Sequence, residues 1–328
     1  MNTIKLTNIK ENGFYGRYMS VNGTVRSGLI LCVDDDANGF LAKGALKWAK
    51  EMGVNALAVS PDKKECGYHS YPLEQIENAV RYLKEQGNQK IGIMGLSAPS
   101  MVALTAASLL PDITLTIALA PPDFVMEGYY TVKLDGTGEH PGNYESSLTW
   151  REKPLPFLPY AYRHPEYWQK HVEESKRRGD LIAARDLFDE SERRHPLQEE
   201  EKIRIEDIRG HIYFAAAEDD VLWDSCKYVR RMMKRLETLN HSCTYEAHLY
   251  GHGTHFVFPE GMVRKLIPFG ISLLLPVVFK EAKGYAKECR ETREDIQRSL
   301  LDVIWKWQNG RLNGKKGECE NEHNGHIT

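Results

Sequence analysis

A repeated alternation between apolar strand patterns and amphipathic helix patterns constrains the fold of this chain most strongly. Apolar residues recur at gaps of three, four and three at Leu73, Ile76, Val80 and Leu83, which places them on one face of a helix. Strands that alternate with such helices form a mainly parallel sheet covered on both faces. The sequence therefore predicts an α/β fold. The expected strands are 28–33, 54–60, 90–96 and 113–120, and the expected helices are 41–52, 73–85 and 99–110.

The pattern changes on both sides of this region. Residues 13–21 and 28–33 flank the turn-like pair Asn22-Gly23, which predicts an opening antiparallel hairpin. Residues 121–205 lose the alternation and are interpreted as a lid-like insertion that contains a charged helical stretch. We expect a single domain over 1–308 and a disordered, polar tail over 309–328. The remaining expectations are a charged helical stretch at 165–192, strands at 211–217 and 243–250, a helix at 224–239 and a last helix that ends near Trp307.

The composition excludes several classes of protein. Of 328 residues, 41% are hydrophobic and 27% are charged, a balance typical of a globular chain. The 43 basic and 46 acidic residues leave a net charge of −3, so no general attraction for nucleic acid or an anionic membrane is expected. Six scattered cysteines without a CxxC pair argue against a disulfide framework.

Two further features bear on location. The longest apolar stretch, 266–279, is shorter than the roughly 20 residues of a membrane span and contains Pro268 and Pro276. We expect it to be a buried or substrate-facing loop, and we expect no membrane span. The first ten residues show no secretory signal, so a cytoplasmic location is predicted, while no pattern predicts an oligomeric state.

The expected strand 90–96 runs directly into a helix through Gly95-Leu96-Ser97. A serine at such a turn can stand clear of the sheet and act as a nucleophile, although it can also simply cap the helix. The usual pattern is GxSxG, and here Pro99 replaces the last glycine. Proline suits the first helical turn, and the backbone amide of Ala98 is retained as the expected oxyanion donor.

Acids and histidines follow the next two expected strands. Asp219 and Asp220 come after strand 211–217, and His252 and His255 come after strand 243–250. An acid can orient a histidine that activates the serine, and the chain order of serine, aspartate and histidine is that of α/β-hydrolases. Taken singly, each aspartate could be a helix cap and each histidine a surface group.

These residues resemble the C-terminal catalytic domain of acyl-CoA thioester hydrolases and bile acid-CoA:amino acid N-acyltransferases. The similarity covers about residues 13–307 and is carried by residues 95–97, 146–157 (SSLTWREKPLPF), 218–223 (EDDVLW) and 250–259. It implies an α/β-hydrolase fold and cleavage of acyl-CoA thioesters through an acyl-enzyme, without a cofactor. The implied roles are Ser97 as nucleophile, His255 as base and Asp220 as orienting acid, with Asp219 and His252 as fallback assignments.

The resemblance also distinguishes between acyl acceptors. In the family that this chain resembles, the members that conjugate amino acids have cysteine at the position of Ser97. A serine there favours transfer of the acyl group to water. The expected partner is a small-molecule acyl-CoA or acyl ester. The alternatives are a carboxylesterase or dienelactone-hydrolase-like enzyme, an acyl-CoA:amino acid N-acyltransferase, and a catalytically silent protein that binds acyl ligands.

A departure from the family lies in the loop after strand 28–33. This loop should supply the second oxyanion amide, from Asp34 or Asp35, yet the chain reads Asp-Asp-Asp-Ala-Asn-Gly over 34–39. Carboxylates beside an oxyanion oppose the charge that forms there. A calcium loop is rejected because its twelfth position is Ala45. A zinc site at His248, His252 and His255 with Cys243 is considered and disfavoured, so no metal is expected.

The aromatic residues of the insertion admit two interpretations. They can line an acyl pocket or form a small core within the insertion itself. These residues are Tyr129, Tyr130, Trp150, Tyr160, Tyr162, Tyr167 and Trp168.

Overall fold

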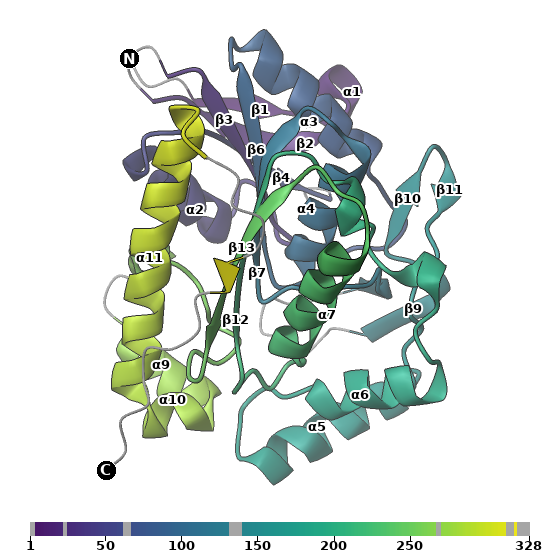
Figure 1. Cartoon of the computed structure of the whole chain (residues 1–328). Helices are drawn as coiled ribbons and strands as arrows, with labels where there is room; N and C mark the ends of the chain where they lie inside the picture. Colours follow the sequence, from purple (N-terminus) through teal and green to yellow (C-terminus); the bar gives the residue numbers. More distant parts are fainter. Residues whose placement is uncertain are drawn as a thin grey trace.

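A nine-stranded sheet forms the centre of the chain, in the order β1-β2-β4-β3-β6-β7-β12-β13-β14 (Figure 1). The computed structural model describes residues 4–21, 25–61, 67–130, 140–266, 270–312 and 318–319. Neighbouring strands from β4 to β14 run parallel, whereas β2 is antiparallel to β1 and β4. The predicted mainly parallel sheet is confirmed. Its strands are β1 (Ile4–Thr7), β2 (Tyr15–Met19), β3 (Ser27–Cys32), β4 (Asn55–Ser60), β6 (Lys90–Leu96), β7 (Ile113–Leu119), β12 (His211–Ala217), β13 (Thr244–Tyr250) and β14 (Glu318–Cys319).

Helices cover both faces of this sheet, as Figure 1 shows. One face carries α2 (Phe40–Glu51) and α11 (Ala286–Gln308), and the other carries α3 (Glu74–Glu85), α4 (Ala98–Leu109) and α7 (Ser225–Thr238). The predicted stripe on α3 is buried in the core. The last helix is held at its end by Lys90, whose Nζ donates to the carbonyl of Trp307 at 2.6 Å. A cation at the C-terminal end of a helix is stabilised by the helix dipole.

The predicted N-terminal hairpin is wrong. β2 pairs with β4, with Gly16 opposite Val59, and β3 lies beyond β4 in parallel with both β4 and β6. The physical reason is burial: β3 is buried at each position, so it needs a neighbour on both edges and a helix on both faces. A short β1 and the four-residue helix α1 (Ile9–Asn12) precede β2, and Asn22-Gly23 lies outside the described residues.

Residues 121–205 form small elements beside the main sheet. The charged stretch predicted to be helical over 165–192 forms two helices, because Gly179 with φ +82° ends the first and the second begins at Arg185. β5 (Tyr71–Pro72) pairs with a strand of this region. Tyr129, Tyr160 and Tyr167 are buried in the main core. The elements are β8 (Glu127–Tyr130), β9 (His140–Ser146), β10 (Leu148–Trp150), β11 (Lys153–Pro154), α5 (Glu166–Arg178), α6 (Arg185–Arg194) and 3-10 turns at Glu199–Glu201 and Ile205–Asp207.

The apolar stretch 266–279 is helical rather than a loop over much of its length. It contains α9 (Ile271–Val278), which lies between α8 (Glu260–Leu266) and α10 (Lys280–Gly284). Leu275 on α9 is buried whereas Val277 is 67% exposed. No helix in the described ranges is long and apolar enough to cross a membrane. In the C-terminal tail, β14 pairs with β13, and residues 313–317 and 320–328 lie outside the described part.

One buried carboxylate links several segments of the 121–205 region. Glu127 is fully buried and accepts hydrogen bonds from the backbone amides of Tyr144 at 2.9 Å and Tyr160 at 2.8 Å. It also forms an ion pair with Arg163. Removing the carboxylate would leave a partly buried guanidinium and two amides without their acceptor.

We expect Glu127→Ala to lower the free energy of unfolding by about 3–5 kcal/mol, the cost of breaking a buried ion pair by removing one partner. Urea denaturation followed by circular dichroism measures the change. Glu173→Ala is the matched control, because Glu173 is 65% exposed and paired only with Lys170, and its expected effect is below about 0.5 kcal/mol. Equal effects of the two substitutions would show that Glu127 is not a structural anchor.

Candidate active site

Ser97 occupies the turn between β6 and α4 in a strained backbone conformation. Its φ is +63° and its ψ is −136°, a region that residues with a side chain rarely adopt. Its backbone amide donates to the carbonyl of Leu119 at 2.8 Å, and its own carbonyl accepts from the Ser100 amide at 2.8 Å. These bonds hold the turn, so the hydroxyl is presented at the carboxyl end of the sheet.

Gly95 is required for this turn. A Cβ atom at residue 95 would lie 2.2 Å from the carbonyl oxygen of Pro99 and 2.4 Å from the amide nitrogen of Ser100. Pro99 sits in the first turn of α4, where its missing N–H removes no intrahelical bond. The replacement of the usual last glycine by proline therefore leaves both the helix and the turn intact.

The serine hydroxyl is joined to a histidine and an acid in one hydrogen-bonded chain. The Oγ of Ser97 lies 2.7 Å from Nε2 of His255, and Nδ1 of His255 lies 2.9 and 3.0 Å from the two carboxylate oxygens of Asp220. We assign the Nδ1 proton to the Asp220 side, because a carboxylate only accepts. Nε2 then accepts from the hydroxyl, and this arrangement can draw a proton from Ser97 as its oxygen attacks a carbonyl carbon.

Asp220 is fully buried and has a polar partner at each oxygen. Besides His255, it accepts from the backbone amide of Leu222 at 3.0 Å and from the hydroxyl of Ser225 at 2.8 Å. His255 is 3% exposed, and the ring of Trp223 meets it edge to face with centroids 4.8 Å apart. The buried pair is thus held in a single orientation from several sides.

The second acid, Asp219, contacts the backbone of the histidine loop instead of the His255 ring. Its Oδ1 accepts from the amides of Gly253 at 3.0 Å and Thr254 at 2.7 Å. Burial raises the pKa of Asp219, and these two hydrogen bonds oppose that shift. Thr254 has φ +56°, so the carboxylate stabilises a strained residue next to His255.

The second histidine, His252, turns away from Ser97. Its ring stacks on the ring of Tyr285 with centroids 3.6 Å apart, and its Nδ1 lies 3.4 Å from Oδ2 of Asp219. Its carbonyl accepts from the hydroxyl of Thr292 on α11 at 2.5 Å. The structure therefore brings together Ser97, Asp220 and His255, and places the fallback pair Asp219 and His252 behind the loop.

Two further residues hold the site through contacts with distant parts of the chain. Arg185, at the start of α6, donates to the carbonyls of Glu218 at 3.1 Å and Asp220 at 3.0 Å. Trp223 belongs to the EDDVLW stretch, and its Nε1 donates to the carbonyl of Ala120 at 3.0 Å. Contacts between the acid turn and distant parts of the chain depend on the tertiary structure.

The residues considered for zinc face different partners. His248 stacks on Tyr213 with centroids 4.8 Å apart and lies 3.6 Å from Glu246, while His252 and His255 have the partners given above. Cys243 contacts His241 at 3.3 Å. Within the ranges that the structure describes, no group of three or more His, Cys, Asp or Glu side chains is arranged to hold a metal ion.

The first expected oxyanion donor is available at the start of α4. Ala98 is the first residue of that helix, so its amide points outward from the helix end and carries part of the positive helix dipole. No hydrogen-bond acceptor for this amide is found in the described part of the chain. It is therefore free to donate to an oxygen placed beside Ser97.

The loop expected to supply the second donor has one buried carboxylate, Asp35, and two half-buried ones, Asp34 and Asp36. Asp35 is 7% exposed, and burial raises the pKa of Asp34 to about 6. The Asp34 carboxyl accepts a hydrogen bond from its own backbone amide, and the charge of His255 favours its ionised form. The Asp34 carbonyl accepts from the Gly67 amide at 3.0 Å. The acidic loop thus lies next to the site rather than pointing into solvent.

Comparison with known proteins gives one family and several distant structures. The family model described as BAAT / Acyl-CoA thioester hydrolase C terminal matches residues 71–260, more than half of the chain. A search of curated proteins gives no match.

Three solved structures are among those to which the chain is similar. A putative α/β hydrolase of unknown function from Agrobacterium tumefaciens is 10% identical and has a TM-score of 0.48, covering 95% of this chain and 98% of its own. An esterase from Pyrococcus furiosus is 13% identical with a TM-score of 0.49, covering 94% and 97%. A putative dienelactone hydrolase from Klebsiella pneumoniae is 9% identical with a TM-score of 0.49, covering 93% and 99%.

The raised pKa of Asp34 leads to a prediction about stability. The ordinary value of 3.8 applies in the unfolded chain, and the folded value is about 6, so the folded chain binds the proton more tightly. Stability therefore falls as the pH rises from about 4 to 6 and stays lower above that window. We expect Asp34→Asn to remove this loss of stability. The change in the free energy of unfolding caused by the substitution is expected to be about 1–3 kcal/mol more stabilising at pH 7.5 than at pH 3.5.

Urea denaturation at both pH values measures this difference. Asp112→Asn is the control, since Asp112 is 54% exposed and lies beside Lys84 on the surface. A change at Asp34 that does not depend on pH would contradict the prediction.

Proposed function

The chain belongs to the BAAT / Acyl-CoA thioester hydrolase C-terminal family and has the α/β-hydrolase fold, and we propose that it is a serine hydrolase that cleaves acyl-CoA thioesters. The observation that carries this proposal is the hydrogen-bonded chain from Ser97 through His255 to Asp220. It occurs at the end of a strained strand-to-helix turn, where nucleophilic serines of this fold lie.

The proposed reaction has two stages. His255 accepts the Ser97 proton at Nε2 while Oγ attacks the thioester carbonyl, and the same proton then passes to the departing CoA sulfur. Water next attacks the serine ester with His255 again as base, and the released Ser97 oxygen takes the proton back. Each stage forms one bond to the acyl carbon and breaks one, and no cofactor is consumed.

Asp220 is proposed to stabilise the imidazolium that forms twice in this cycle. Its two oxygens lie at 2.9 and 3.0 Å from Nδ1 of His255, and a buried carboxylate interacts strongly with a cation because the local dielectric is low. Asp220 also keeps the Nδ1 proton in place, so that Nε2 remains the acceptor facing Ser97.

We propose that the oxyanion accepts one hydrogen bond from the backbone amide of Ala98 and a second from the backbone amide of Asp34 or Asp35. Because the Asp34 amide donates to its own carboxyl, an oxyanion must displace that carboxyl to use this donor. The charge on Asp34 opposes this displacement, so protonation of Asp34 should help it. Activity that uses this donor would therefore fall as the pH rises through the pKa of Asp34, about 6.

Labelling with a fluorophosphonate tests the serine mechanism without assuming a substrate. We expect one adduct on the native chain by intact-mass measurement, and none on Ser97→Ala or His255→Ala, because the probe reacts with a serine whose proton is taken by a base. The absence of an adduct on folded native protein would contradict the mechanism and favour a silent acyl-ligand-binding protein.

An acyl-CoA panel then tests the substrate. Release of CoA that persists in Ser97→Ala would contradict the assignment of the nucleophile. Oxygen esters cleaved far faster than thioesters of the same chain length would favour a carboxylesterase or dienelactone-hydrolase-like enzyme. Acyl-glycine or acyl-taurine as the main product would indicate an N-acyltransferase.

The two neighbouring aspartates allow a matched comparison. We infer that Asp219 is a positioning residue, since it bonds the backbone next to His255, and an asparagine there keeps an accepting oxygen. Asp219→Asn is therefore expected to retain most of kcat, and Asp219→Ala to lose about 100-fold, the scale of a misplacement near 1 Å. Asp220→Asn is expected to lose on the order of 10⁴-fold, the effect of a wrong imidazole tautomer in such triads.

Steady-state rates of CoA release, with circular dichroism as the check on folding, measure these differences. If Asp219→Asn lowered the rate as much as Asp220→Asn, the negative charge of Asp219 would be needed for the reaction itself. Asp219→Ala as active as the native chain would remove its positioning role.

A further inference from the structure

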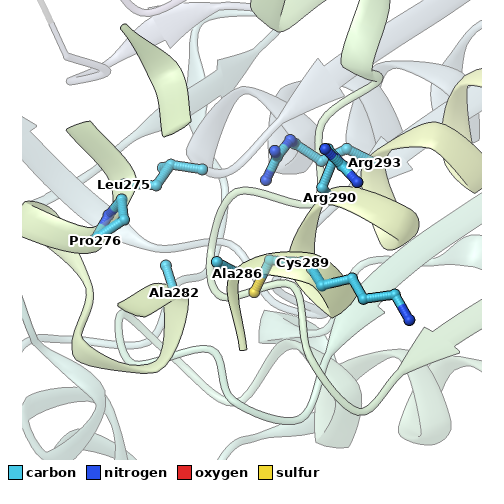
Figure 2. A pocket seen from close by; sticks show the side chains of 8 residues that line it. Leu275, Pro276, Ala282, Ala286, Cys289, Arg290 and Arg293 are labelled. Atoms are coloured by element: carbon cyan, nitrogen blue, oxygen red, sulfur yellow. The ribbon is translucent and has the colours of Figure 1, made fainter. Parts of the chain in front are cut away.

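A hollow of about 270 Å³ lies behind the histidine loop, between α9, α10 and α11. Ser97 is not among the residues that line it, and Thr292 on α11 donates to the carbonyl of His252 in the histidine loop. Figure 2 shows Leu275 and Pro276 on one side of the hollow and Arg290 and Arg293 on the opposite side. One wall is therefore apolar and the other is basic.

The basic wall carries no acidic side chain. The residues that line the hollow include Lys287, Arg290 and Arg293, and the remaining lining residues are uncharged. Arg290 is 55% exposed and lies 3.8 Å from Glu294, and Lys287 is 73% exposed and lies 3.7 Å from Glu291. Both ion pairs are long and solvated, so they hold their cations weakly.

Arg293 is the strongest sign of a binding site in this wall. Its side chain is 3% exposed, and its Nε donates to Oε2 of Glu260 at 2.8 Å. In the part of the chain that the structure describes, no hydrogen bond is found for its two terminal nitrogens, and neither is among the fully buried unpaired atoms. A guanidinium carries five N–H donors, so these accessible donors can bind an acceptor placed in the hollow that Arg293 lines.

Arg293 shares its carboxylate partner with a second arginine. Glu260 is the shared partner of two arginines, since its Oε1 accepts from Nε of Arg264 at 3.0 Å while Oε2 accepts from Arg293. One carboxylate therefore balances two guanidinium groups. An anion in the hollow would supply acceptors for the N–H donors of this wall that have none.

We propose that this hollow binds a compact amphiphilic anion. Its carboxylate or phosphate would lie against Arg290 and Arg293, because the planar guanidinium fork matches both groups. Its hydrocarbon part would contact Leu275, Pro276 and Ala282. The hollow is slightly smaller than the usual range of about 300–1,000 Å³ for ligand pockets, which favours a short chain over a long one.

Titration calorimetry on the full chain tests the proposal with four probes: octanoate, octyl phosphate, octanol and inorganic phosphate. We expect saturable binding of octanoate or octyl phosphate at one site. Octanol lacks the anionic group and inorganic phosphate lacks the hydrocarbon chain. Each is expected to bind at least about tenfold more weakly, because octanol loses a charged hydrogen bond and phosphate loses buried apolar area. Stronger binding of one of the first two probes identifies the preferred headgroup.

Two variants locate the binding. Arg290→Gln removes charge from the basic wall, and Ala286→Leu fills the hollow from an exposed position on α11, so neither disturbs the core. Each is expected to weaken binding by about tenfold. Arg298→Gln is the matched control, because Arg298 lies on the same helix, is 73% exposed and pairs with Asp295, and it should leave binding unchanged. Arg293→Gln should act like Arg290→Gln if the chain still folds.

The proposal is overturned if neither octanoate nor octyl phosphate binds saturably, or if Arg290→Gln and Ala286→Leu bind as tightly as the native chain. The test measures binding and needs no turnover, so its result does not depend on whether Ser97 is a nucleophile.

Discussion

The parallel pairing of β6, β7, β12 and β13 is the constraint on which the whole site depends. In this register Leu96 lies opposite Leu119, Leu119 opposite Ala215, and Ala217 opposite Tyr250. The carboxyl ends of these strands therefore meet at one edge of the sheet. Ser97, Asp220 and His255 each follow one of these ends, so side chains far apart in sequence come within hydrogen-bond distance. Burial of the strands on both faces makes a slip of register costly, and this cost keeps the three groups aligned.

Buried carboxylates organise the parts of the chain that the sheet does not hold. Glu127 joins the backbone of two segments to Arg163, and Asp123 pairs with Arg231 on α7. Asp219 holds the histidine loop in the same way. Removing either partner of such a buried pair is costly. The hollow beside α11 differs, because Lys287, Arg290 and Arg293 line it and the other lining residues are uncharged, which is why we propose an external anion there.

Strand and helix positions in the central sheet could be predicted because burial imposes a visible periodicity. The predicted strands at 90–96 and 211–217 coincide with β6 and β12, and the stripe on α3 is buried as expected. The partner of β2 could not be predicted, because a strand pattern shows which face is apolar and not which neighbour pairs with it. The break between α5 and α6 at Gly179 and the helix α9 were also missed, since polar and apolar runs each suit more than one structure. Arg185 and Thr292 support the site from distant elements and carry no local signal.

The sequence alone determined the α/β class, the order of serine, aspartate and histidine, and their positions after strands, because periodicity and chain order are local properties. It did not decide between Asp219 and Asp220 or between His252 and His255 on chemical grounds. Neighbouring residues in a turn point in different directions, and the path of the loop selects which one faces Ser97. That path depends on Thr254 at φ +56°, on two hydrogen bonds to Asp219 and on contacts with α11. These interactions exist only once the distant elements have packed. Periodicity and chain order could not select the pair for that physical reason, whereas the family resemblance implied Asp220 and His255, the pair that the structure places beside the serine.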